Sequence, residues 1–368
     1  MCSTHAAGAS THVARASTHV ARALGVLIAL AVLPGIDADL SLMNSRFAVL
    51  LGLVYIWIPF MILPVYASIE EIDFTYREAA MDLGADRRGV DMGPSALRYA
   101  GLAAEIDAIG HGCTDAGDLP VPTPETTTSR PDRNAKYLAE TESVCRDLRA
   151  AVIDAFDDGA FPLVLGGDHS IAIGTVGGSA TRGSTGLVWL DAHGDFNTPE
   201  TTPSGNVHGM SVAALLGRGS FADDEWATAP ALAPENVAMV GIRSLDDAER
   251  EALVDSDVTV FTMSDIDQRG LPAVIDDAFD VATDGTDGTH VSLDMDFLDP
   301  DEAPGVGTPV RGGVTYREAH AAMEAVADRF DAVRSMEIVE VNPILDSHNR
   351  TAELGVELLA SALGKRII

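Results

Sequence analysis

Three side chains that commonly bind metal ions alternate along the stretch DAHGD. Asp191, His193 and Asp195 stand at positions i, i+2 and i+4, and Asp294 and Asp296 repeat this spacing further along the chain. Alternate side chains of an extended chain point to the same side, so each set can converge on one point. A further imidazole, His169 in the stretch GGDHS, is also available. We expect these residues to form a metal centre.

The number and type of these side chains indicate more than one ion. Four carboxylates and two imidazoles exceed what a single ion needs if it keeps one position open for water. Two ions that share bridging carboxylates fit better, with a water or hydroxide held between them. Ligation that is rich in carboxylate and free of thiolate favours Mn²⁺ or Mg²⁺ over Zn²⁺, and the imidazoles favour Mn²⁺. If the acids only capped helices or faced solvent, their gathering at buried strand ends would be costly, because buried charges need a partner.

The elements that would position these residues can be predicted from apolar periodicity. Each cluster follows a short apolar run, as expected at the carboxyl edge of a parallel sheet. The runs cover residues 161–167, 186–191, 236–242, 290–296 and 335–341. Between them, residues 135–156 and 316–330 carry apolar residues three and four apart, which is typical of helices, and Thr315 is the expected N-cap of the second. The pattern predicts an α/β fold with a mainly parallel sheet.

The charge of the chain excludes one class of partner. Its 368 residues carry a net charge of −32, with 56 acidic residues against 24 basic ones, and such a surface repels nucleic acid. Adaptation to a salt-rich cytoplasm explains this composition better than a specific basic partner does. The three cysteines show no ligand spacing, which is typical of a reducing compartment and predicts a cytoplasmic protein.

The first eighty residues differ in composition from the rest. Residues 1–35 repeat the triplet STH, which we interpret as a targeting peptide or a misassigned gene start rather than a site in which the repeated histidines bind metal. Residues 36–80 include an uncharged apolar run, 47–67, that is long enough to span a bilayer. We therefore expect an N-terminal apolar helical segment that contacts or tethers to a membrane, with a buried core helix as the alternative.

Part of this region has a resemblance of its own. Residues 49–85 resemble the permease subunits of ABC importers, through Glu78-Ala79-Ala80 followed by Gly84. One span cannot make a permease, so the resemblance implies a permease fragment and not a transporter.

A second resemblance covers residues 81–368. The motifs GGDHS, DAHGDFNTPETTPSGNVHG, SLDMDFLDP and EVNP, preceded by GVDMGPSALRYAGL, resemble the ureohydrolases, in particular the arginase branch. The resemblance implies a three-layer α/β/α fold, two manganese ions per subunit, hydrolysis of the small guanidino substrate L-arginine to L-ornithine and urea, and a trimeric or hexameric homo-oligomer. The alternatives are an agmatinase or another guanidino-acid amidinohydrolase, or a non-functional fusion of permease and arginase pieces.

The same resemblance assigns roles to individual residues. It places one manganese ion on His169, Asp191, Asp195 and Asp294, and the other on His193, Asp191, Asp294 and Asp296. Asp195 would also accept a hydrogen bond from the metal-bridging hydroxide that attacks the guanidinium carbon. His208 would give a proton to the leaving amine, and Glu340 would hold the guanidinium through charge-assisted hydrogen bonds.

Substrate selection is expected to lie in the loop after Asp195. Asn197 follows by two residues and should turn to the metal side, and Ser204 can donate from its hydroxyl. The resemblance implies that Asp246 accepts from the substrate ammonium across the mouth of the site. The remaining candidate contacts are Glu249 and Thr308. Because agmatinases usually lack this loop, the resemblance favours arginine over agmatine.

One departure from the family concerns the start of the domain. Ureohydrolases begin with an apolar strand, and residues 75–80 put hydrophilic side chains in its place. We therefore expect an internal strand of the sheet to be missing. Each buried backbone group left without a partner would cost about 1–3 kcal/mol, which puts stable folding of the domain in question.

Overall fold

The computed structural model describes residues 73–85, 89–123 and 133–367, which belong to one compact unit of the chain. The repeats of residues 1–35 and the apolar run 47–67 lie outside these residues. Within the described part of the chain, no helix is long and apolar enough to cross a bilayer.

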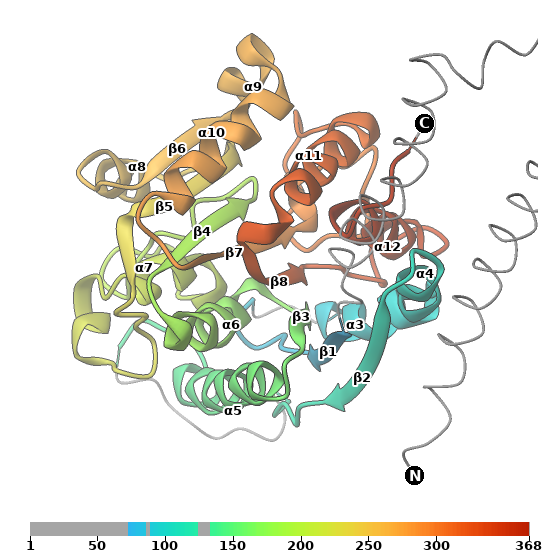
Figure 1. Cartoon of the computed structure of the whole chain (residues 1–368). Helices are drawn as coiled ribbons and strands as arrows, with labels where there is room; N and C mark the ends of the chain where they lie inside the picture. Colours follow the sequence, from blue (N-terminus) through green and yellow to red (C-terminus); the bar gives the residue numbers. More distant parts are fainter. Residues whose placement is uncertain (1–72, 86–88, 124–132, 368) are drawn as a thin grey trace, which may run out of the picture. The chain divides into compact units, whose positions relative to one another are not determined.

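A single eight-stranded sheet forms the centre of the unit (Figure 1). Every pair of neighbouring strands is parallel, as the sequence predicted. The strand order is β2-β1-β3-β8-β7-β4-β5-β6. The strands are β1 (Asp73–Ala79), β2 (Gly112–Asp118), β3 (Phe161–Gly166), β4 (Thr185–Leu190), β5 (Leu232–Ile242), β6 (Thr259–Thr262), β7 (Gly288–Asp294) and β8 (Val333–Val339).

Helices cover both faces of this sheet, which confirms the three-layer α/β/α architecture (Figure 1). The helices that share the larger core with one face are α3 (Gly93–Tyr99), α4 (Leu102–Ala108), α9 (Met263–Arg269), α10 (Leu271–Thr283), α11 (Tyr316–Asp328) and α12 (Arg350–Ala362). The helices on the other face are α5 (Leu138–Asp157), α6 (Ala172–Ser179), α7 (Ser211–Leu215) and α8 (Asp247–Val254). The inner strands β3 and β4 are apolar along nearly their whole length because both of their faces are buried.

The two predicted helices are present, and their ends lie within three residues of the predicted positions. α11 begins after Thr315, whose hydroxyl accepts from the backbone N–H of Glu318, while the Glu318 carboxylate accepts from the Thr315 backbone. This reciprocal pair satisfies two backbone donors that the first helical turn leaves free. The predicted helix of residues 135–156 is α5, which begins three residues later.

The expectation of a missing strand was wrong. Residues Asp73–Ala79 form β1, which hydrogen-bonds to β2 on one side and to β3 on the other. No strand is therefore missing at this position of the sheet. The residues that resembled a permease loop belong to this region: Glu78 and Ala79 lie in β1, and a side chain at Gly84 would collide with Asp168. The permease resemblance is therefore not supported for these residues.

A hydrophilic sequence can form this strand because its side chains alternate between faces. Phe74 and Tyr76 are buried on the same face as Glu78, and the Phe74 ring packs edge-on against Phe161. The Glu78 carboxylate is paired with the guanidinium of Arg98 from α3, which also bonds to Asp118 at 2.6 Å. The same guanidinium lies over the Tyr76 ring, 5.5 Å from its centroid. Arg98 thus provides the positive charge that lets a glutamate face the interior.

Replacing Arg98 should therefore destabilise the domain. In Arg98→Met, the buried Glu78 carboxylate loses the guanidinium that pairs with it, and breaking a pair of this kind costs up to about 3 kcal/mol. The control is Asp118→Asn, whose exposed carboxylate contributes about 0–1 kcal/mol. Urea unfolding of the metal-free protein measures both free energies. Equal midpoints for Arg98→Met and the wild type would show that β1 does not depend on this pair.

Candidate metal centre and substrate pocket

The predicted metal-binding residues meet at the carboxyl edge of the sheet. His169 begins the short helix η3 (His169–Ile171) after β3, and Asp191 directly follows β4. Asp294 ends β7, and Asp296 lies in the short helix η7 (Met295–Phe297) that follows it. Because the strands are parallel and adjacent, their carboxyl ends lie side by side, which brings together residues that are far apart in the sequence.

The first cluster gathers around the imidazole of His169. Its Nδ1 atom lies 3.1 Å from an oxygen of Asp191, 3.1 Å from one of Asp294 and 3.5 Å from one of Asp195. His169 is buried, and its Nδ1 atom has no hydrogen-bond partner among the described residues. The buried Asp191 Oδ2 also lacks one. Atoms of this kind that face one another without a hydrogen bond form a donor set that a cation can complete.

A second cluster lies beside the first and shares Asp191 with it. His193 Nδ1 is 3.0 Å from an oxygen of Asp296 and 3.5 Å from Asp191 Oδ1. Asp191 therefore presents one oxygen to each cluster, which is the arrangement that a carboxylate bridging two ions requires. Asp294 offers an oxygen to the first cluster, and its Oδ1 accepts a hydrogen bond from the backbone N–H of Asp296 at 2.7 Å. Its predicted contact with the second ion stays a prediction.

Burial and mutual repulsion set the charges in this centre. Burial raises the pKa of Asp195 and of Asp294, and a neighbouring carboxylate raises each further. Burial also opposes ionisation of Asp191, but the two imidazoles outweigh it and lower its pKa. For His193, burial is outweighed by the carboxylates of Asp296 and Asp191, which raise its pKa. In the metal-free centre, His193, Asp195 and Asp294 therefore tend to keep their protons, and a metal ion would displace those protons on binding.

Supporting contacts around His169 were not predicted from the sequence. Its Nε2 atom lies 2.7 Å from the hydroxyl of Ser292, which donates to the buried Glu337 at 2.8 Å. Trp189 stacks on the imidazole, with the ring centroids 3.8 Å apart and the planes 5° from parallel. These contacts fix the orientation of the ring. One signal was available: Ser292 and Glu337 each stand between two apolar residues, Ser292 in β7 and Glu337 in β8.

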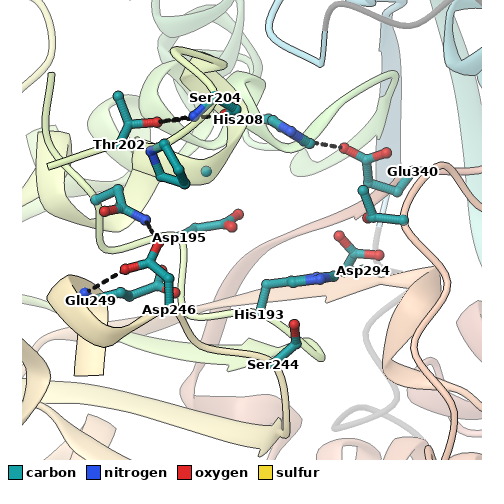
Figure 2. A pocket seen from close by; sticks show the side chains of 14 residues that line it. His193, Asp195, Thr202, Ser204, His208, Ser244, Asp246, Glu249, Asp294 and Glu340 are labelled. Carbon is teal, nitrogen blue, oxygen red and sulfur yellow. Dashed lines mark hydrogen bonds and ion pairs between the residues drawn. The ribbon is translucent and has the colours of Figure 1, made fainter.

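Above the clusters lies a pocket of about 220 Å³ (Figure 2). Most of the predicted site residues line it, whereas His169, Asp191 and Asp296 are buried and do not line it. The predicted residues that line it are His193, Asp195, Asn197, Ser204, His208, Asp246, Glu249, Asp294, Thr308 and Glu340. Thr202 and Ser244 also line the pocket and were not predicted. The hydroxyl of Thr308 donates to Asp296 at 2.9 Å, so it is tied to the metal-type carboxylates.

One wall of the pocket carries His208 and Glu340. His208 Nδ1 lies 3.1 Å from Glu340 Oε1, which also accepts from the backbone N–H of His169 at 3.1 Å. The other carboxylate oxygen, Glu340 Oε2, is buried without a hydrogen-bond partner among the described residues. Burial lowers the pKa of His208, but the hydrogen bond and charge of Glu340 outweigh it and raise the pKa to about 9. The imidazole is therefore protonated at neutral pH in the metal-free protein.

The opposite wall carries the candidate selectivity residues. Asn197 donates to Asp246 at 2.7 Å and accepts from the Thr201 hydroxyl at 2.8 Å, so Asn197 and Asp246 lie together rather than across the mouth from each other. Glu249 is buried and accepts from the backbone N–H of Phe196, and burial raises its pKa to about 7. Ser204 is exposed at the rim. The hydrogen bond between Asn197 and Asp246 joins residues that are 49 positions apart, so local spacing in the sequence does not reveal it.

Comparison with known proteins gives a consistent result. Residues 77–364 match the model of the arginase family. The arginase of Brevibacillus brevis is 49% identical over 290 residues, which cover 78% of this chain and 96% of that relative. The crystal structure of Bacillus caldovelox arginase superposes with a TM-score of 0.77 at 44% identity and covers 81% of this chain and 100% of its own.

A more distant structure supports the same grouping. Entamoeba histolytica arginase, solved in complex with L-ornithine, is similar with a TM-score of 0.71 at 30% identity, and it covers 80% of this chain and 100% of its own. The family match begins within β1 and covers the other seven strands, the two clusters and the pocket. The chain therefore belongs to the arginase family, and it is an enzyme of the amidinohydrolase class.

Proposed function

We propose that the protein hydrolyses L-arginine to L-ornithine and urea with the help of two manganese ions. The observation that carries the proposal is the shared carboxylate of Asp191, which joins two His/Asp clusters at the floor of a polar pocket. The similarity to arginases at 40–49% identity supports the choice of substrate.

The residues present fit manganese. The clusters offer carboxylate oxygens and imidazole nitrogens without a thiolate, and this donor set favours Mn²⁺ among the common divalent ions. The first ion would be held by His169, Asp191, Asp195 and Asp294, and the second by His193, Asp191, Asp294 and Asp296. When bound, two such ions supply a water molecule acidic enough to act as a nucleophile near neutral pH.

Glu340 is suited to hold the guanidinium group of the substrate. Its Oε1 atom is already bonded to His169 N and His208, so the free acceptor is Oε2, which is buried at the pocket wall. A guanidinium N–H can donate to this oxygen in a charge-assisted hydrogen bond. The contact would pin the carbon that is attacked at the floor of the pocket, and desolvation of the carboxylate strengthens it.

His208 is suited to protonate the leaving amine. Its Nδ1 atom is engaged by Glu340, which leaves Nε2 to give a proton to the ornithine nitrogen. Because Glu340 raises the pKa of His208 to about 9, the imidazole carries that proton at neutral pH. Asp195 is close to His169, and we assign it to positioning the attacking water by a hydrogen bond.

Arginine fits the opposite wall better than agmatine, which lacks the α-carboxylate. Asn197 has a second amide N–H beside the one given to Asp246, and Ser204 has a hydroxyl at the rim. Both can donate to a carboxylate, while Asp246 and Glu249 can attract an ammonium group. Agmatine or another guanidino acid is the second candidate. The trimeric or hexameric assembly, the cytoplasmic location and the adaptation to salt stay predictions from the sequence.

Removing the shared carboxylate should empty the centre. Asp191→Asn is expected to lose manganese from both positions and to release no urea, because an amide brings no negative charge to either cluster. Metal analysis of the purified protein and a urea assay measure this. The control is Asp247→Asn, an exposed acid at the start of α8 that does not line the pocket. A variant that kept two ions and a near-normal rate would show that Asp191 is not shared.

The charge on His208 should depend on Glu340. In the metal-free protein, we expect the His208 ring to titrate with a pKa of about 9, so that the proton is held at pH 7 and lost as the pH rises through 9. Glu340→Gln removes the negative charge and should lower this pKa toward about 6.5, the usual value for histidine. NMR of labelled histidine measures the titration, and His208→Ala assigns the signal. A wild-type pKa near 6.5 would contradict the assigned role.

Selectivity for arginine should weaken when the donors at the rim are removed. The wild type is expected to prefer arginine over agmatine in kcat/KM by about 10⁴-fold, as for sites that hydrogen-bond a group which the competitor lacks. Asn197→Ala combined with Ser204→Ala should lower kcat/KM for arginine and leave manganese content unchanged. Glu200→Gln is the control, since Glu200 is exposed in the same loop and does not line the pocket. Equal or better use of agmatine by the wild type would exclude an arginase.

A further inference from the structure

The guanidinium of Arg243 lies beneath the second cluster and outside the pocket lining. Arg243 directly follows β5 and makes five hydrogen bonds, all to main-chain carbonyls. The shortest are to Asp296 O at 2.7 Å and to Val310 O at 2.8 Å. The planar fork of an arginine side chain can hold several carbonyls in fixed directions at once, which a lysine cannot do.

These bonds join three segments that carry site residues. The carbonyls of Asp296, Phe297 and Leu298 belong to the segment after β7, and that of Val310 lies two residues from Thr308. The backbone N–H of Arg243 itself donates to Ala192 O at 2.9 Å, between Asp191 and His193. Arg243 therefore fixes the distance between the segment that carries Asp191 and His193 and the segment that carries Asp296.

The first cluster has different supports. His169 is oriented by the hydroxyl of Ser292, which is bonded to Glu337, and its backbone N–H is held by Glu340. None of the hydrogen bonds of Arg243 reaches these residues. The two halves of the centre are thus braced independently, although they share Asp191.

The positive charge of Arg243 lies close to the same carboxylates. Its hydrogen-bond partners are all neutral carbonyls, so no bonded carboxylate cancels the charge. The carboxylates of Asp296 and Asp191 attract it from nearby. The fit around the group is close, since a side chain at Gly313 would collide with Nη2. A fixed cation here reduces the repulsion among these carboxylates in the metal-free protein, but it also repels a divalent ion. Arg243 therefore supports the second position through its hydrogen bonds and not through its charge.

We propose that Arg243 is a positioning residue that sets the affinity of the second metal position, formed by Asp191, His193 and Asp296, without contact to the substrate. The inference rests on the proposed two-manganese function. Removing a group that orients metal ligands from behind commonly weakens metal binding by about 10–100-fold. Removing Arg243 should therefore weaken the binding of the second ion and leave the binding of the first ion unchanged.

The experiment compares Arg243→Met with a matched control, Arg334→Met. Arg334 is also a half-buried arginine bonded to main-chain carbonyls, those of Ser179 and Ser184, but it lies near the amino end of β8, away from the site. Manganese titrations of the metal-free proteins, followed by electron paramagnetic resonance and metal analysis, give the two dissociation constants separately. Urea release is then measured against manganese concentration.

We expect the wild type and Arg334→Met to bind two ions with the same affinities. Arg243→Met should keep the first and bind the second about 10–100-fold more weakly, with activity restored by excess manganese. If Arg243→Met is insoluble, Arg243→Lys is measured in its place. A lysine can keep some of the hydrogen bonds, so we expect a smaller increase in the dissociation constant of the second ion.

Other outcomes would separate the two hypotheses. Two unchanged constants in Arg243→Met, or in Arg243→Lys if that variant carries the test, would overturn the role of Arg243 and leave the proposed function standing. An equal weakening of both ions, matched by Arg334→Met, would overturn it as well, because it would reveal a general loss of stability. A wild-type chain that binds fewer than two ions would instead overturn the two-manganese function.

Discussion

The carboxylate of Asp191 presents one oxygen to each of two imidazoles, and the site is built around this contact. Burying it together with the carboxylates of Asp195, Asp294 and Asp296 would be prohibitive without positive charge nearby. The imidazoles and the guanidinium of Arg243 supply part of that charge, and divalent ions, which the donor set suits, would supply the rest. The parallel sheet contributes the geometry, since adjacent strand ends bring the acids within reach of one another.

The same balance of buried charge explains how the sheet keeps its unusual first strand. β1 lies between β2 and β3, so its loss would expose one side of the strand that leads to His169. Its buried glutamate is matched by an arginine from the following helix, just as the acids of the metal centre are matched by cations. In both places, a buried charged group is tolerated because the fold holds an opposite charge next to it.

The sequence allowed the strands, their parallel order and the metal-type residues to be predicted, because apolar runs and alternate spacing are local signals. The hydrophilic β1 was missed because its stability depends on Arg98, twenty residues away. The pairing of Asn197 with Asp246 and the hydrogen bond of Ser292 to Glu337 were missed for the same reason. Each joins segments that only the folded sheet brings together, so no window of sequence contains the interaction.

Two residues of the site have a backbone conformation that side chains other than glycine rarely adopt: φ is 46° at Asp195 and 64° at Glu340. Each such residue costs about 1–3 kcal/mol, which the surrounding packing must offset. Glycine would relieve the strain at either position and would also delete a carboxylate from the pocket. Directed evolution that rewards heat resistance alone would therefore favour glycine at these two positions and lose a carboxylate from the site, so a selection for thermostable variants has to include turnover in its screen.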